Sequence, residues 1–309
     1  MQTILGAGGA IANELAKHLT EYTTDIRLVG RNPKKVNPTD SLFKADLTDS
    51  VQIFKAVEGS EVVYLTVGFE YVTKTWQSLW LPTVTSTIAA CEKYNAKLVF
   101  FDNVYAIGGD NVQHITEQSP ISPSSKKGEV RAAVDRLILE HIQKGTLQAI
   151  IARAPDFFGP QKEKSILMNV VYDNLAKGKT AQWLGDANKI HTTGYAPELA
   201  KGTAILGNTP DAFNQIWNLP VSAEKLTGKQ WVQLFAEAMG AKSSKVQALP
   251  GWGQWAIGWF VPFMKEMYEM NYQYDRDYFF DSSKFNKRFN YTPISNKTAV
   301  QQTVAALKG

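Results

Sequence analysis

Three small residues near the start of the chain have the spacing of a phosphate-binding turn. They follow the apolar run Thr3-Ile4-Leu5 in the pattern Gly6-x-x-Gly9-x-x-Ala12, and a stretch of helical periodicity comes next. Glycines at such a turn let a diphosphate reach the backbone N–H groups of a helix N-terminus, because no Cβ stands in the way. An ordinary strand-to-helix turn is the alternative. The pattern predicts a dinucleotide site with phosphate contacts from Gly6, Ala7, Gly9, Ala10 and Ile11.

Basic residues follow the second predicted strand, Asp25–Gly30, where a dinucleotide-binding fold selects its cofactor. An acidic side chain there accepts a hydrogen bond from the ribose of NAD, whereas an arginine pairs with the additional phosphate of NADP. This strand leads into Arg31 and Asn32, with no carboxylate. A solvated basic turn is the alternative to a binding role. The residues favour NADP as the cofactor, with NAD as the second choice.

Strands and helices alternate through the first half of the chain, which indicates an α/β fold with a doubly wound, parallel, Rossmann-like sheet. The strong apolar run Glu61–Val67 is typical of a strand buried on both faces. Ligands gather at the carboxyl ends of such strands. Further strands are predicted at 43–45, Lys97–Phe101 and Leu147–Arg153, helices at 48–57, Trp76–Tyr94 and Lys127–Lys144, and further cofactor contacts at Asp46, Leu47, Thr66, Val67 and Pro155.

The pattern becomes irregular and rich in aromatic residues beyond Gly159. We therefore expect a cofactor-binding core over residues 1–160 and a smaller, partly interleaved substrate-binding lobe over residues 161–309. The aromatic run Trp252–Phe263 is too short to span a bilayer and is read as a buried or interface helix. Within the lobe, short strands are predicted at Gln215–Leu219 and Lys245–Leu249, and helices at Gly228–Met239 and Lys297–Lys308.

The composition is that of an ordinary globular protein, with 309 residues, of which 44% are hydrophobic and 20% charged. A net charge of +4, spread along the chain, gives no reason to expect nucleic acid as a partner. The single cysteine, Cys91, cannot form an internal disulfide, and the four histidines lie far apart, so no metal site is expected. The first strand begins too close to Met1 for a leader segment, which favours the cytoplasm. The partner expected is a small-molecule substrate, and a homodimer is left open.

These motifs together resemble the extended, in part atypical, short-chain dehydrogenase/reductase family of the NAD-dependent epimerase/dehydratase type. Besides the glycine turn and the basic end of the second strand, the resemblance rests on Ala45-Asp46-Leu47, Tyr105-Ala106-Ile107-Gly108, Arg153–Pro160 and His191–Ala200. It implies a Rossmann-like cofactor domain and a small C-terminal substrate domain. The family's chemistry uses a serine together with a tyrosine and a lysine in Tyr-x-x-x-Lys spacing.

All three of these catalytic side chains are replaced here. By the resemblance, Asn103 stands at the serine position, Lys127 at the tyrosine position and Arg131 at the lysine position. Asn103 can donate an amide hydrogen bond to a carbonyl oxygen, and Arg131 can bind ribose hydroxyls. Lys127 can act as a proton donor only where burial, Arg131 or an oxidised nicotinamide lowers its pKa from about 10.4 toward neutrality. A surface lysine is the alternative. Tyr105 offers a phenol at the same strand end, unless it only packs beneath the loop.

Aromatic residues at the carboxyl ends of central strands can form the wall of an apolar or ring-shaped substrate. They are Tyr71 and Trp76 after the fourth strand, and Phe157 and Phe158 after the sixth, and core packing explains several equally well. The sequence therefore predicts an NADP-dependent oxidoreductase or epimerase-like enzyme for a small carbonyl or hydroxyl compound, for example a sugar derivative. One alternative is an inactive NADP(H)-binding sensor or regulatory protein. Another is a structural protein that binds no nucleotide.

Overall fold

The structure, a computed structural model, describes residues 1–161 and 165–308. The chain forms two compact units, and it passes between them several times. The first unit contains Met1–Ala106, Lys127–Ala154 and Pro197–Leu219. The second contains Ile107–Lys126, Pro155–Ala196 and Pro220–Gly309.

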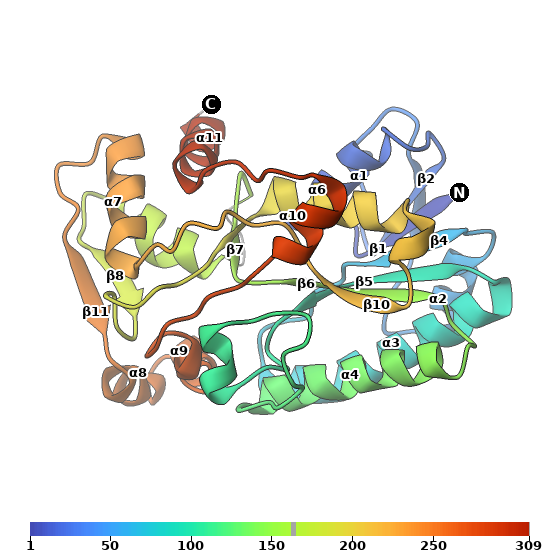
Figure 1. Ribbon diagram of the computed structural model, residues 1–309, viewed down its shortest axis with the longest axis horizontal. Coiled ribbons are helices and arrows are strands. Elements are labelled where there is room, and N and C mark those ends of the chain that lie inside the picture. The colour runs from blue at the N-terminus through green and yellow to red at the C-terminus, as the bar shows by residue number, and fades with distance from the viewer. Residues whose placement is uncertain (162–164, 309) are drawn as a thin grey trace. The chain divides into compact units, whose positions relative to one another are not determined.

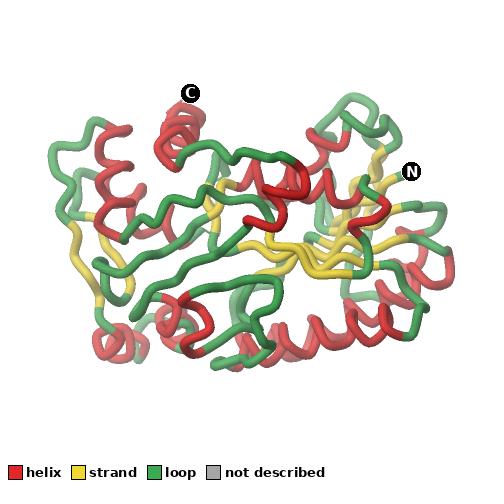
Figure 2. Tube along the Cα trace, viewed as in Figure 1, coloured by secondary structure: helices red, strands yellow, loops and turns green. Residues whose placement is uncertain are grey.

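A seven-stranded parallel sheet forms the centre of the first unit, in the order β10-β6-β5-β4-β1-β2-β3 (Figures 1 and 2). This confirms the predicted doubly wound α/β class. Strand order reverses direction between β1 and β4, which are hydrogen-bonded neighbours in register from Gln2↔Val62 to Leu5↔Leu65. The strands are β1 Gln2–Leu5, β2 Ile26–Gly30, β3 Ser41–Lys44, β4 Val62–Leu65, β5 Lys97–Asn103, β6 Ala149–Ala154 and β10 Gln215–Asn218.

Helices cover both faces of this sheet, with α2, α3 and α4 on one side and α1 and α6 on the other (Figure 1). Local sequence sets their ends: Asp49 caps α2 by accepting hydrogen bonds from the N–H groups of Val51 and Gln52, and Asn95 ends α3 in the left-handed conformation. The helices are α1 Ala10–Leu19, α2 Ser50–Val57, α3 Thr73–Tyr94, α4 Lys126–Gln143 and α6 Ala196–Gly207.

The edge strand β10 could not be assigned to this sheet from sequence. Its pattern predicts a short strand at Gln215–Leu219, which is confirmed, but the chain places it beside β6 in register from Gln215↔Ile150 to Asn218↔Arg153. Strand propensity is local, whereas the choice of a partner strand depends on where α6 delivers the chain. The sheet therefore gains a seventh strand from residues far along the sequence.

The second unit has its own hydrophobic core, formed by Phe158, Trp231 and Phe235 with neighbouring apolar residues. Helix α7 begins with a capping box, in which Thr227 and Gln230 bond each other's backbone N–H groups. Two small parallel pairs, β7-β9 and β8-β11, complete the unit. Its strands are β7 Phe157–Phe158, β8 Ala181–Leu184, β9 Gly194–Tyr195 and β11 Val246–Leu249, and its α-helices are α5 Asp173–Ala176, α7 Gly228–Met239, α8 Gly251–Gly258, α9 Pro262–Tyr268, α10 Ser283–Phe289 and α11 Asn296–Lys308. Its short 3-10 or π-helical segments are η1 Gly109–Gln113, η2 Met168–Tyr172 and η4 Asn271–Gln273. A further short helix, η3 Pro210–Ala212, belongs to the first unit.

The aromatic run at Trp252–Phe263 forms α8, a connection and the start of α9 instead of one buried helix. Several of its side chains are exposed, among them Trp252 at 77% and Phe260 at 88%. The burial alternative is therefore wrong for these side chains, whereas the interface alternative stays a prediction. No helix within the described part of the chain is long and apolar enough to cross a membrane.

Candidate functional site

The glycine turn joins β1 to α1 in a conformation that other residues rarely adopt. Gly6 has φ +118° and Gly8 has φ +91°. A Cβ on Gly6 would lie 2.6 Å from the backbone nitrogen of Val67, so the turn packs directly on the end of β4. Apart from its own chain neighbours, no residue that the structure describes lies within 4 Å of the position where Gly8 would carry a Cβ. Gly6 is therefore needed for close packing on the end of β4, whereas Gly8 leaves open space at the turn.

The start of α1 presents backbone donors at this open side. Gly9 is the N-cap residue, and no side chain caps the helix. The first turn contains no acidic residue. Because the first N–H groups of a helix have no partner within it, and because the helix dipole favours negative charge there, this turn fits a diphosphate. Ala12 is buried against the sheet.

Arg31 and Asn32 are exposed directly after β2. The nearby Asp46 follows β3, and its carboxylate accepts hydrogen bonds from the N–H and hydroxyl of Thr48 at 2.9 and 2.8 Å. These bonds, with a smaller contribution from the charge of Arg31, lower the pKa of Asp46. Leu47 is buried. The predicted cofactor residues of the first unit thus follow β1, β2 and β3 at one edge of the sheet.

Two further predicted contacts come from the end of β4. The Thr66 N–H donates to the Leu5 carbonyl at 2.9 Å, and Val67 is the residue against which Gly6 packs. Pro155 is buried and belongs to the second unit.

The end of β5 holds Asn103 and the buried Asp102. The Asn103 side-chain oxygen accepts a hydrogen bond from the Tyr105 N–H at 3.0 Å. The Asp102 carboxylate accepts from the Arg131 Nε at 2.7 Å and also pairs with its Nη2. Arg131 is 2% exposed, and its guanidinium carbon lies 4.1 Å from the ring centre of Trp80. Its charge is therefore balanced by Asp102.

A second buried ion pair lies beside the first. The Arg153 Nη2 donates to Asp135 at 2.9 Å, and both side chains are completely buried. Within the described residues, the Arg153 Nε and Nη1 and one oxygen of each aspartate, Asp102 and Asp135, have no hydrogen-bond partner. Burial, together with the charge of Asp102, raises the pKa of Asp135 to about 7, although the charge of Arg153 opposes this.

Lys127, on the first turn of α4, is completely buried and lies among aromatic residues of the first unit. Its Nζ donates to the Thr73 hydroxyl at 2.9 Å and lies 4.6 Å from the centre of the Tyr71 ring. The Tyr71 hydroxyl donates to the Tyr105 hydroxyl at 3.3 Å. Trp76 stacks on Tyr105, with ring centres 5.9 Å apart. We call Tyr71, Thr73, Tyr105 and Lys127 the lysine–tyrosine cluster.

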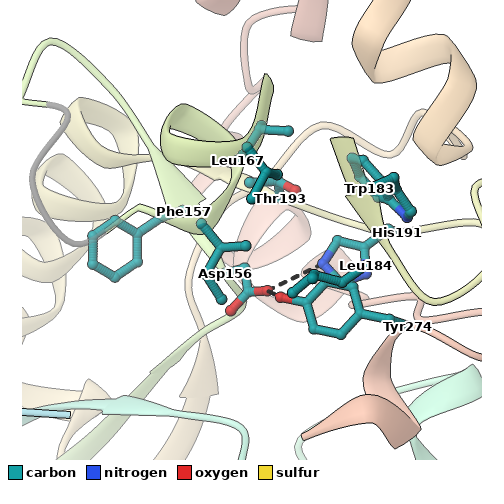
Figure 3. Close-up of a pocket in the computed structure, with 10 residues that line it drawn as sticks. Asp156, Phe157, Leu167, Trp183, Leu184, His191, Thr193 and Tyr274 are labelled. Carbon is teal, nitrogen blue, oxygen red and sulfur yellow. Dashed lines mark hydrogen bonds and ion pairs between the residues drawn. The ribbon is translucent and has the colours of Figure 1, made fainter. Parts of the chain in front are cut away.

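The second unit contains a pocket with about 300 Å³ of empty space, part of it open to solvent (Figure 3). Its polar side chains are Asp156, His191, Thr193 and Tyr274. The Asp156 carboxylate accepts a hydrogen bond from the Tyr274 hydroxyl at 2.6 Å, and the same oxygen lies 3.1 Å from the His191 Nε2. The remaining lining is apolar: Phe157, Ile166, Leu167, Val170, Trp183 and Leu184.

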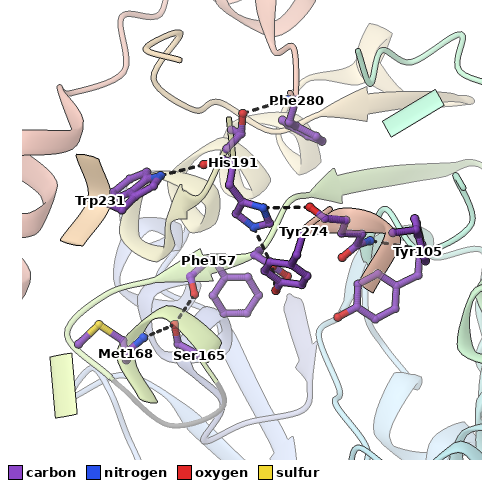
Figure 4. Close-up of polar contacts among 12 residues, drawn as sticks. Tyr105, Phe157, Ser165, Met168, His191, Trp231, Tyr274 and Phe280 are labelled. Carbon is purple, nitrogen blue, oxygen red and sulfur yellow. Dashed lines mark hydrogen bonds and ion pairs between the residues drawn. The ribbon is translucent and has the colours of Figure 1, made fainter. Parts of the chain in front are cut away.

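His191 is held from several directions (Figure 4). Its Nδ1 lies 3.2 Å from the Gln273 carbonyl oxygen, so Nδ1 carries a hydrogen. Its ring is stacked between Tyr274 and Tyr278, with centre distances of 4.6 Å on each side. The Trp231 indole donates to the His191 carbonyl at 2.8 Å. His191 and Asp156 therefore form a rigid polar pair in an otherwise largely apolar pocket.

A comparison with known families gives a match over residues 3–219 to the model of the NAD dependent epimerase/dehydratase family. The chain belongs to this family. A curated relative, an uncharacterized UDP-glucose epimerase YtcB from Bacillus subtilis (strain 168), is 21% identical over 269 residues, which cover 78% of this chain and 83% of the relative.

Solved structures share the fold of this family member. The UDP-glucose 4-epimerase of Thermus thermophilus, in complex with NAD, has a TM-score of 0.78 at 16% identity and covers 100% of this chain and 99% of its own. A double mutant of the dTDP-glucose 4,6-dehydratase DesIV from Streptomyces venezuelae, with NAD and DAU bound, has a TM-score of 0.80 at 15% identity, with coverage of 100% and 97%.

The epimerase/dehydratase fold brings Tyr71, Trp76, Tyr105 and Lys127 together in the first unit. The other predicted substrate residues, Phe157 and Phe158, lie in the second unit. Phe157 lines the pocket there, whereas Phe158 is 1% exposed and packs in the core. We therefore leave Phe158 out of the proposed site.

Several site residues of this family member were not found from sequence. Asp156 and His191 lie within motifs that carry the resemblance, but the sequence did not predict that they form a polar pair in a pocket. No sequence pattern identifies Thr73 or Tyr274 as a candidate site residue. Residues with hydroxyl groups are common, and only the fold brings these two to a site. Among residues 1–161 and 165–308, no group of three or more histidine, cysteine, aspartate or glutamate side chains is arranged to hold a metal ion.

Proposed function

We propose that the protein is an NAD(P)-dependent enzyme that acts on a hydroxyl or carbonyl carbon of a sugar-derived substrate. The observation that carries this proposal is the open glycine turn at the start of α1, which packs on the end of β4, the strand that precedes Tyr71 of the lysine–tyrosine cluster. Two similar structures, a UDP-glucose 4-epimerase and a dTDP-glucose 4,6-dehydratase, both contain NAD, and both are named for a nucleotide sugar, which supports a nucleotide sugar as the substrate class.

The cofactor would be held by the first unit. Gly6, Ala7, Gly9, Ala10 and Ile11 would surround its diphosphate, and Asp46, Leu47, Thr66 and Val67 would flank it. A bound nicotinamide supplies hydride transfer. Arg31 would bind the additional phosphate of NADP through charge-assisted hydrogen bonds.

Asn103 and the lysine–tyrosine cluster would provide the polar groups around the reacting carbon. Asn103 would donate from its amide nitrogen, which makes no hydrogen bond to any residue that the structure describes. The ribose-binding role expected for Arg131 is less well supported, because Asp102 already binds its guanidinium.

Calorimetric titration with NAD and NADP tests the cofactor proposal. We expect NADP to bind more tightly, and Arg31→Ala to weaken NADP binding about tenfold to a hundredfold, as loss of charge-assisted hydrogen bonds does. Affinity for NAD should stay the same. Lys35→Ala is the matched control, because Lys35 lies in the same exposed loop. Equal effects of Arg31→Ala on both nucleotides would show that Arg31 does not select the cofactor.

The replacement of the serine, tyrosine and lysine favours a second candidate, a cofactor-binding sensor without catalysis. Both candidates predict nucleotide binding, but only the enzyme turns over a substrate. A panel of nucleotide sugars, assayed with each nicotinamide nucleotide, separates them. Tight cofactor binding with no turnover on the whole panel would favour the sensor.

A further inference from the structure

The lysine–tyrosine cluster combines a buried cation with two phenols of different accessibility. Lys127 is completely buried and Tyr105 is 8% exposed, whereas Tyr71 is only half-buried. A ligand can therefore reach the Tyr71 phenol more easily than the other two groups. Tyr71 is also the residue that contacts both others, through its hydroxyl to Tyr105 and its ring to Lys127.

The ammonium group of Lys127 is suited to stabilise negative charge on Tyr71. A buried cation needs polar or aromatic partners, and here the Thr73 hydroxyl and the face of the Tyr71 ring provide them. A cation at this range favours the ionised form of a neighbouring acid. The Tyr105 hydroxyl, 3.3 Å from that of Tyr71, can then donate to the phenolate.

Arg131 is less suited to this task although it lies one turn further along α4. Its guanidinium is paired with the Asp102 carboxylate, and the two charges cancel at short range. Lys127 is therefore the better source of positive charge for a phenol in this part of the fold.

The position of Tyr71 in the sheet agrees with a role beside a bound nucleotide. It lies in the loop after β4, and the glycine turn follows the adjacent strand β1. Strand order reverses between these two strands. In open α/β sheets, ligands bind at such a reversal, outside the carboxyl ends of the strands.

We propose that Tyr71 is the residue that exchanges a proton with the substrate, and that Lys127 and Tyr105 are positioning residues that stabilise its phenolate. This rests on the proposed function. When a substrate hydroxyl is oxidised, its O–H bond breaks and the proton forms the O–H bond of Tyr71. The substrate C–H bond breaks as well, and its hydrogen would leave with both electrons as a hydride. A nicotinamide cofactor would supply the acceptor. The phenol would thus come from the loop after β4 and the lysine from α4. Lys127 stands where the family resemblance places the tyrosine.

Ultraviolet difference titration of the full-length protein, without and with NAD, tests the pair directly. We expect one phenol to ionise at lower pH than the others, and Tyr71→Phe to remove this ionisation. Lys127→Met should raise its midpoint by about one to three pH units, while Lys127→Arg keeps the cation and keeps the midpoint low. Tyr94→Phe is the control, since it removes a hydroxyl elsewhere in the first unit. An early ionisation that persists in Tyr71→Phe, or that Lys127→Met leaves in place, overturns the proposal.

Single-turnover rates separate this inference from the proposed function. If the enzyme turns over a nucleotide sugar, Tyr71→Phe should lower the rate about 10²- to 10⁴-fold, with an unchanged dissociation constant for the cofactor. A Tyr71→Phe variant as fast as the wild type overturns the role of Tyr71 and leaves the enzyme function standing. The expected titration without any turnover overturns the enzyme function, and the catalytic role of Tyr71 with it.

Discussion

Two arginines and two aspartates form a buried network in the first unit, and their charges explain why this part of the chain differs from an ordinary core. Asp102 pairs with Arg131 and Asp135 with Arg153, all four at 2% exposure or less. Some polar atoms of this network have no hydrogen-bond partner among the described residues, and they lower the free energy of unfolding if all four groups are charged. A proton on Asp135 reduces the repulsion from Asp102, which agrees with its raised pKa.

Asp135 should make the stability of the protein depend on pH. Its folded-state pKa of about 7 lies above the ordinary value of roughly 3.9 for the unfolded chain. Protonation of Asp135 in the folded state therefore makes its full contribution to the free energy of unfolding below about pH 4. This contribution is lost as the pH rises from there through about 7. In Asp135→Asn this loss should be absent, so the free energy of unfolding should fall less between pH 4 and 8 than in the wild type. Denaturant titrations across this range measure it.

The control for this prediction is Glu58→Gln, which removes an exposed carboxylate of the same unit. Its stability should follow pH as the wild type does. If Asp135→Asn and the wild type lose stability in parallel as the pH rises, the network holds Asp135 as a carboxylate throughout.

The sequence marked candidate positions but not their contacts. The family resemblance assigns candidate roles to Asn103, Lys127 and Arg131, and these roles stay predictions. That Arg131 is bound by Asp102, and Lys127 by Thr73, could not be predicted, because both contacts join residues that are far apart in sequence. Cys91 is the only cysteine of the sequence, so it cannot form an internal disulfide, and it is buried. Burial raises the pKa of its thiol to about 12, so it is also a poor nucleophile.

At the scale of elements, two of the three glycines in the turn between β1 and α1 have different tasks. Gly6 allows close packing on β4, and Gly8 allows a positive φ beside open space. Gly6→Ala should unfold at clearly lower temperature, because its Cβ would collide with the backbone at Val67. Gly8→Ala should lose only about 1–2 kcal/mol, the usual cost of a strained backbone conformation. Thermal unfolding of the two variants side by side measures the difference.

Nucleotide binding by the Gly8→Ala variant gives a further test of the turn. If the open side of the turn receives the diphosphate, Gly8→Ala should weaken cofactor binding more than its small loss of stability suggests. Equal affinity of Gly8→Ala and the wild type for NAD and NADP would place the diphosphate elsewhere.

Helix and strand positions followed from local patterns more fully than sheet membership did. Helix α7 matches its predicted range, Gly228–Met239, because a capping box and a left-handed glycine mark its two ends. Helix α3 begins at Thr73, three residues before the predicted Trp76, since Val72 at its N-cap has no side-chain signal. The pairing of β10 with β6 depends on the whole path of the chain, which no local pattern contains.

At the scale of the whole molecule, each unit has a core of its own, and a single substitution should reveal that of the second unit. Phe158 packs edge-on against Trp231 and Phe235, with ring centres 5.4 and 5.9 Å away. Phe158→Ala should lower the free energy of unfolding by about 3–5 kcal/mol. Phe260→Ala, at an exposed position, should change it by no more than about 0.5 kcal/mol. Chemical denaturation compares them, and similar losses would contradict the core position of Phe158.

The late arrival of β10 also has a consequence for how the protein is made. During synthesis, β6 leaves the ribosome about 60 residues before β10, and for that interval it is the outermost strand of the growing sheet. Its buried sequence Ala149–Ala154 then presents unpaired backbone groups, the kind of edge at which nascent chains associate with one another. The segment between the two strands belongs mostly to the second unit. The sheet that would bind the nucleotide is thus completed only after two segments of the second unit, Ile107–Lys126 and Pro155–Ala196, have been translated.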